Sequence, residues 1–141
     1  MKKNNFIEIL VVEPNKEPYL KEIGHTLESL QRIVDGLIEY INLEDNVDLI
    51  CNEEGKMNNL PFNRSIGNDV IAGTFIIAGV NLNTGETISI PKNKVDKYME
   101  LFSLANHKKT IEYLNAEFIE SSNLAYMQFI DIEDLNSNEK E

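Results

Sequence analysis

The 141-residue chain holds 13 Lys and Arg residues against 24 Asp and Glu residues, which gives a formal net charge of −11. With 42% hydrophobic and 26% charged residues, the composition is typical of one folded domain and not of a disordered chain. The acidic excess argues against direct binding to nucleic acid and against docking on anionic lipid, because both require Lys and Arg to neutralise phosphates. It is compatible with binding to a basic protein surface or to a small ligand in a pocket.

No signal for export, membrane insertion or metal binding stands out along the chain. Every apolar run is far shorter than the ~20 residues that cross a bilayer. The first apolar run contains Glu8 and lacks a small-residue cleavage site, so a secretory signal is not expected. The single cysteine, Cys51, has no intramolecular disulfide partner, and His25 and His107 lie far apart with no metal-ligand spacing. We therefore expect a cytoplasmic protein without a cofactor or a bound metal.

The first elements predicted along the chain are a strand and a helix. Residues 6–12 form a nearly continuous β-branched run, which is typical of a central strand buried on both faces. Helix is favoured after Pro18. Thr26 is the expected N-cap of a helix over residues 27–35, and Gly36 is its expected C-terminal stop.

A hairpin and a long loop follow. Apolar and polar residues alternate on both sides of a turn at residues 44–46, which predicts a hairpin of residues 37–43 and 47–51. Residues 52–69 contain five asparagines and no sustained period, so they are predicted to form a loop. Loops of this length in compact domains are usually functional or mobile.

The second half of the chain predicts another hairpin, two helices and a last strand. Residues 70–80 and 86–90 flank a turn rich in asparagine and predict the hairpin. Pro91 opens a helix that extends to about residue 105. Further elements are expected at residues 107–120, a helix, and at residues 124–132, a strand. The first of the two helices carries an apolar stripe that should face the core: Val95, Tyr98, Met99 and Phe102.

Together these elements predict a single α+β domain over residues 1–132, with a mostly antiparallel sheet of five to six strands and about three helices. Residues 133–141 are acidic and are expected to fray into solvent. Because so many strands in a short chain leave sheet edges to cover, we expect a homodimer or a higher oligomer.

Short segments in a fixed order give the chain a family resemblance. They are Val12-Glu13-Pro14, Thr26 to Gln31 with Val34-Asp35-Gly36, Cys51 to Lys56, Leu60 to Arg64, and Ile71 to Phe75 with Gly79. Over residues 6–102 this pattern resembles the family known as domain of unknown function 3846. The resemblance implies an occurrence in bacteriophages, plasmids and other mobile elements, and it implies no established activity. Residues 103–141 lie outside the resemblance.

The predicted loop concentrates donors and acceptors of both signs between apolar anchors. A guanidinium fork matches a carboxylate or a phosphate in two parallel hydrogen bonds, and asparagine reads the edge of a base or an amide. The loop is therefore a candidate site for a nucleotide-like ligand or a partner protein. A purely structural alternative stays open, in which Arg64 pairs with Glu53 or Glu54 and the asparagines cap turns. The candidate residues are Asn52, Glu53, Glu54, Lys56, Asn63 and Arg64.

No motif indicates catalysis. The chain lacks a nucleophile elbow, a phosphate-binding loop, an HExxH motif and a dinucleotide-binding fingerprint. Glu53 and Glu54 are adjacent carboxylates, but neighbouring residues of a strand point to opposite faces, which is awkward for a shared substrate. Cys51 shares a strand face with Val47 and Leu49 and is predicted to be a buried structural thiol. We therefore expect a protein that is not an enzyme.

Two functions remain open at this stage. In the first, the chain is a binding protein of a phage or mobile element that antagonises host defence by sequestering a small nucleotide-like signal molecule, which requires Arg64 and Lys56 to converge on a cavity. In the second, it is an acidic anti-CRISPR-type inhibitor, and its charge of −11 directs it to a nucleic-acid-binding cleft of a defence complex. Both functions belong to the host cytoplasm. No residue distinguishes these two functions from a third, a general interaction module for phage or plasmid maintenance.

Overall fold

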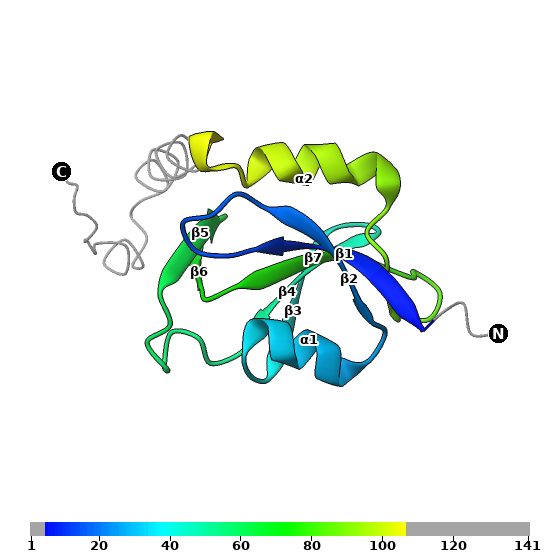
Figure 1. Ribbon diagram of the computed structural model, residues 1–141, viewed down its shortest axis with the longest axis horizontal. Helices are drawn as coiled ribbons and strands as arrows, with labels where there is room; N and C mark the ends of the chain where they lie inside the picture. Colours follow the sequence, from blue (N-terminus) through cyan, green and yellow to red (C-terminus); the bar gives the residue numbers. More distant parts are fainter. Residues whose placement is uncertain (1–4, 107–141) are drawn as a thin grey trace.

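A computed structural model describes residues 5–106 of the chain. Its main element is a six-stranded antiparallel sheet in the order β2-β1-β7-β4-β3, with β8 paired to β7. Figure 1 labels the five strands of this order. The predicted α+β class with a mostly antiparallel sheet is confirmed. The strands of this sheet are β1 (Phe6–Val12), β2 (Tyr19–Gly24), β3 (Ile38–Glu44), β4 (Val47–Asn52), β7 (Phe75–Val80) and β8 (Thr87–Ile88), and a separate two-stranded sheet pairs β5 (Phe62–Ile66) with β6 (Asp69–Ala72).

The sheet has an apolar core on each face, and β1 contributes to both. Leu10 and Val12 pack into the core under one helix, whereas Ile9 and Val11 pack into the core under the other. All four side chains are essentially inaccessible to solvent. Side chains of a strand alternate between faces, so only a strand covered on both sides can bury consecutive apolar residues. The prediction for residues 6–12 is confirmed.

The helix α1 (Leu27–Val34) covers one face of the sheet. Its N-cap is Thr26, whose hydroxyl accepts a hydrogen bond from the amide of Ser29 at 3.1 Å, as the sequence predicts. Leu30 and Val34 pack into the core of Ile9 and its neighbours. The helix ends at Asp35, which adopts the left-handed conformation with a φ of 64°.

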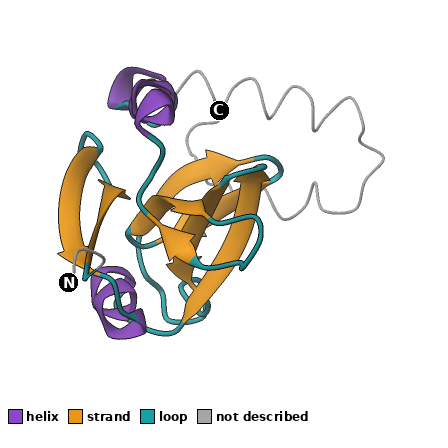
Figure 2. Cartoon of the chain, turned by 90° about the vertical axis from the view of Figure 1, so that its right-hand side faces the viewer, coloured by secondary structure: helices purple, strands orange, loops and turns teal. Residues whose placement is uncertain are grey.

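The helix α2 (Val95–Leu101) covers the opposite face, so the two helices lie on opposite sides of the strands in Figures 1 and 2. It follows Pro91 through a single 3-10 turn, η1 (Lys92–Lys94). Tyr98 and Phe102 are buried, and the Phe102 ring meets Phe75 edge-on with ring centroids 5.2 Å apart. The predicted apolar stripe is therefore part of the core.

Three predictions about the strands need correction. Residues 19–24 form β2 and not the beginning of a helix. Because β2 lies at the edge of the sheet, Ile23 is its one buried residue, and the alternation that marks a strand is lost. Within the predicted loop of residues 52–69, β5 and the start of β6 form a hairpin. The predicted strand of residues 70–80 is interrupted at Gly73, whose φ of 88° separates β6 from β7.

The predicted hairpin of residues 37–43 and 47–51 is confirmed as the pair β3 and β4. Three further predictions, the helix over residues 107–120, the strand over residues 124–132 and the frayed tail at residues 133–141, lie outside the described residues. Across the part of the chain that is described, no helix has the length and apolar character needed to cross a membrane.

Candidate binding site

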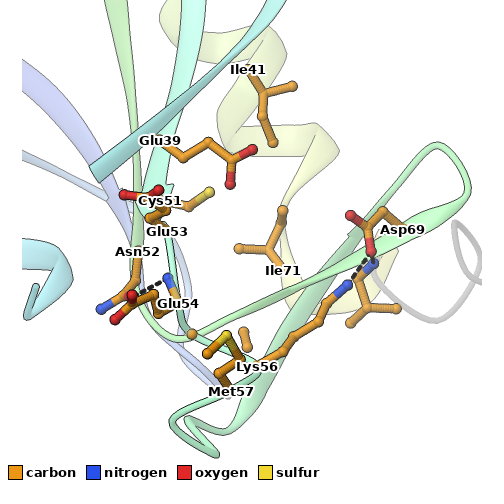
Figure 3. Close-up of a pocket in the computed structure, with 13 residues that line it drawn as sticks. Glu39, Ile41, Cys51, Asn52, Glu53, Glu54, Lys56, Met57, Asp69 and Ile71 are labelled. Atoms are coloured by element: carbon orange, nitrogen blue, oxygen red, sulfur yellow. Dashed lines mark hydrogen bonds and ion pairs between the residues drawn. The ribbon is translucent and has the colours of Figure 1, made fainter. Parts of the chain in front are cut away.

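A pocket of about 170 Å³ opens where β4 leads into the loop of residues 53–61 (Figure 3). Its walls come from four segments: the edge strand β3, the end of β4, this loop, and β6 of the small sheet. Five charged side chains lie around it, Glu39 from β3, Glu53, Glu54 and Lys56 from the loop, and Asp69 from β6. The pocket is thus assembled from segments that are distant in sequence.

The charge around the pocket is predominantly negative, with four carboxylates and one ammonium group. Lys56 forms an ion pair with Asp69. Among residues 5–106, no hydrogen bond or ion pair engages the carboxylates of Glu39, Glu53 and Glu54, and all three side chains are exposed. Three of the residues that line the pocket are therefore acidic and have no cationic partner among residues 5–106.

The inner wall of the pocket is apolar and includes Cys51, Ile41 and Ile71. The Cys51 side chain is buried, and this burial, reinforced by the negative charges of Glu39 and Asp69, raises the pKa of its thiol to about 11. At neutral pH the thiol is protonated, and a protonated thiol is a weak nucleophile. The predicted buried thiol is confirmed, and it serves the pocket as an apolar surface.

The loop of the pocket is held by its own main chain. The amide of Asn58 donates to the Glu54 carbonyl at 2.9 Å, and the amide of Leu60 donates to the Gly55 carbonyl at 3.0 Å. Gly55 lies so close to β6 that a Cβ atom at this position would be 2.6 Å from the Ala72 carbonyl oxygen. Only glycine permits this approach, so the loop is fixed against β6.

Asn52 connects the loop to the end of α1. It is 6% exposed, and its amide nitrogen donates to the carbonyls of Val34 at 3.1 Å and Asp35 at 3.0 Å. Its side-chain oxygen accepts a hydrogen bond from the Glu54 amide at 2.7 Å. The side chain therefore caps the C-terminus of the helix and fixes the first turn of the loop at the same time.

Arg64 lies away from the pocket, although the sequence suggests a common site. Its side chain is 2% exposed, and its Nε and Nη2 donate to the Phe102 carbonyl at 2.9 Å and 2.8 Å. Nη2 also donates to the Lys16 carbonyl at 2.7 Å, and burial lowers the pKa of the guanidinium. Its acceptors are thus mainly main-chain carbonyls, and neither Glu53 nor Glu54 pairs with it.

Asn63 belongs to the same buried network as Arg64. Its amide nitrogen donates to the carbonyls of Val12 at 2.8 Å and Gly73 at 2.9 Å, and its oxygen accepts from Nη1 of Arg64 at 2.8 Å. The six predicted residues therefore fall into two groups. Asn52, Glu53, Glu54 and Lys56 line the pocket, whereas Asn63 and Arg64 connect β5 to β1, α2 and the chain after β1.

The side chains of the pocket that sequence reasoning missed include Glu39, Met57 and Asp69. Glu39 carried a usable signal, because the predicted hairpin places it on the strand beside Cys51, and the structure pairs these two residues across β3 and β4. Asp69 carried none, since residues 62–72 were not recognised as a hairpin. The sequence therefore indicated the loop but not the strands that enclose it.

No three His, Cys, Asp or Glu side chains of residues 5–106 are grouped so as to hold a metal ion. Searches of curated proteins and of solved structures give no match to the chain. A family of proteins does match it, over residues 7–103, which is more than half of its length and agrees with the resemblance seen over residues 6–102. The chain therefore belongs to the family described as Domain of unknown function (DUF3846).

Proposed function

We propose that the chain is a non-enzymatic binding protein whose pocket takes a cationic group, the lysine or arginine side chain of a basic partner protein. The observation that carries this proposal is the set of three carboxylates, Glu39, Glu53 and Glu54, that surround one pocket without a cationic partner among the described residues. A guanidinium or an ammonium group would gain charge-assisted hydrogen bonds from them. Its aliphatic stem would pack against the apolar wall of Ile41 and Cys51.

The same geometry disfavours a nucleotide-like ligand. That function requires Arg64 and Lys56 to converge on a cavity, but the Arg64 guanidinium is bound to buried carbonyls and Lys56 is paired with Asp69. A phosphate in the pocket would meet the carboxylates of Glu39 and Glu53, and the one ammonium group of the pocket, Lys56, already pairs with Asp69. Between the two functions left open by the sequence, the pocket supports the acidic inhibitor.

The class of partner follows from the charge of the whole chain. A net charge of −11 attracts a basic surface from a distance, and the pocket supplies a specific contact at short range. We propose that the basic surface is the nucleic-acid-binding cleft of a host defence complex, and that the chain acts in the cytoplasm as a counter-defence protein of a phage or another mobile element. The support for this context is the acidic charge together with the family resemblance.

The proposal is tested by calorimetric titration of the protein with a short arginine-rich peptide and, separately, with ATP. We expect the peptide to bind and ATP not to bind. Each exposed carboxylate contributes about 0.5–1 kcal/mol, so the double variant Glu39→Gln with Glu53→Gln should bind the peptide about fivefold to thirtyfold more weakly. The matched control is Glu22→Gln with Glu28→Gln, which removes the same charge from β2 and α1.

The two variants separate a specific pocket from a general attraction of charge. If the pocket variant and the control lose the same affinity, the pocket is not the binding site and the proposal fails. Binding of ATP with an affinity that the pocket variant improves, through loss of negative charge, would instead favour the nucleotide-like ligand. Raising the salt concentration should weaken peptide binding in all variants, because exposed charges are screened.

A further inference from the structure

The outer edge of β3 is open in the described part of the chain. β3 is the last strand in the order β2-β1-β7-β4-β3, so among residues 5–106 it has one neighbour, β4. The Leu37 carbonyl accepts a hydrogen bond from the Glu53 amide at 2.8 Å, so these two residues are a hydrogen-bonded pair next to the β3–β4 ladder. In an antiparallel pair, bonded and non-bonded residue pairs alternate. Glu39 therefore faces β4 with its main chain, whereas Ile38 and Tyr40 present their main-chain groups to the outside.

This open edge is also a wall of the pocket. The side chains of Glu39 and Ile41 line the pocket, and Figure 3 shows both on the strand that borders it. A strand added beside β3 would direct every second side chain to the same face as Glu39 and Ile41. The edge and the pocket would then act together, because main-chain hydrogen bonds would hold the added strand while one of its side chains enters the pocket.

We infer that the β3 edge accepts an extended, basic segment of a partner protein as an added strand, with a lysine or arginine side chain of that segment in the pocket. This inference rests on the proposed function and adds the mode of binding to it. Strand addition at an open edge gives affinity through the main chain and specificity through alternate side chains. The exposed side chain of Tyr40, 48% accessible, lies on the other face and offers a contact for the neighbouring residues of the segment.

Charge selects the partner segment over a second copy of the chain. Two copies paired through this edge would bring the carboxylates of both pockets together, and these would repel one another locally. A bulge after Asn42 ends the regular part of the edge, which limits its pairing to a short segment. A basic peptide meets both conditions, since it is attracted by the carboxylates and needs few residues to fill the edge.

The test is amide hydrogen exchange with a defined probe, a short blocked peptide of alternating threonine and arginine. On addition of the peptide, we expect exchange at the amides of Ile38 and Tyr40 to slow by about tenfold or more. The amide of Ile41 serves as an internal control, because it is already paired with β4 and should change little. A second peptide, methylated on all its amide nitrogens, keeps the charge but cannot donate the hydrogen bonds of an added strand from either edge.

The outcomes distinguish this inference from the proposed function. If the parent peptide binds without slowing exchange at Ile38 and Tyr40, or if the peptide methylated on all its amide nitrogens binds as well as the parent, the pocket function stands and the added strand is refuted. If no peptide binds, the proposed function and this inference both fail. If these amides are protected without peptide, and more so at higher protein concentration, the edge pairs with a second copy and the inference is overturned.

Discussion

Replacing Arg64 by alanine measures how strongly the buried network holds the fold. The guanidinium makes five hydrogen bonds, and two of its acceptors, the Phe102 carbonyl and the side-chain oxygen of Asn63, are buried. A buried acceptor left without a donor costs about 1–3 kcal/mol, so two cost about 2–6 kcal/mol. Because the variant no longer buries a charge, part of this cost is offset, and we expect a net loss of about 3 kcal/mol.

A loss of this size is easily measured by thermal unfolding. For a domain of about 100 residues, 1 kcal/mol lowers Tm by about 4–8 °C, so Arg64→Ala should melt about 12–24 °C below the parent. Arg64→Lys keeps the charge but not the planar fork, and it should fall between the two. The control is Arg32→Ala, which removes an exposed arginine of α1 and should change the stability by less than about 0.5 kcal/mol.

Two results would count against this account of Arg64. If Arg64→Ala melts within about 3 °C of the parent, the hydrogen bonds do not hold the fold as described. If the variant stays folded but loses the arginine-rich peptide, Arg64 contributes to binding, as the sequence suggests. A destabilised variant whose folded fraction binds normally would remove Arg64 from the site.

Three further predictions concern other parts of the molecule. Hydrogen bonds from Lys94, Tyr98 and Lys97 lower the pKa of Glu44 to about 2 from its usual 4.5. The ionised Glu44 therefore stabilises the fold above pH 4.5, and this stabilisation is lost as the pH falls toward 2. In Glu44→Gln, the free energy of unfolding measured with urea should depend less on pH in this window. Asn52→Ala should lower the free energy of unfolding by about 2–3 kcal/mol, and a loss below about 0.5 kcal/mol would contradict its capping role. We expect light scattering to give a mass of at least twice the 16.1 kDa of one chain, as for a homodimer. Among the described residues, β2 is the other edge strand of the sheet and is available for this pairing. The mass of a single chain at high protein concentration would refute the homodimer.

The sequence predicts those elements whose burial follows a simple period. The strand at residues 6–12 and the helix over residues 27–35 bury regular apolar sets, and Thr26 caps the helix as expected. The strand β2 escapes the same reasoning because it buries only Ile23. The strand β5 escapes it for another reason, since its two buried residues, Asn63 and Arg64, are polar. Polar residues of this kind predict an exposed loop as long as their buried hydrogen-bond acceptors are unknown.

The sequence predicts only part of the candidate site, because residue types do not reveal burial. Asparagine and arginine satisfy buried carbonyls as well as they bind ligands, so their types alone cannot separate a structural network from a binding site. Burial separates them here. Asn63 and Arg64 are at most 5% exposed and fully engaged, whereas Glu53 and Glu54 are exposed in the same short stretch of chain. The sequence pattern indicates the loop that forms one wall of the pocket. Glu39, on the opposite wall, is identified only once the pairing of β3 with β4 is known.

Most carboxylates of the described residues have no ion pair, and the pocket is distinguished by the number of them that it brings together. Lys94 and Lys97 both bind Glu44, on the side of the molecule covered by α2. A chain with a charge of −11 lowers its own repulsion each time it pairs a carboxylate with a lysine, yet Glu39 and Glu53 border a pocket without such a pair among residues 5–106. A basic partner would supply the missing cations. Under the proposed function, binding would relieve repulsion that the isolated chain retains, and this would give the pocket a thermodynamic preference for a cationic group over an anionic ligand.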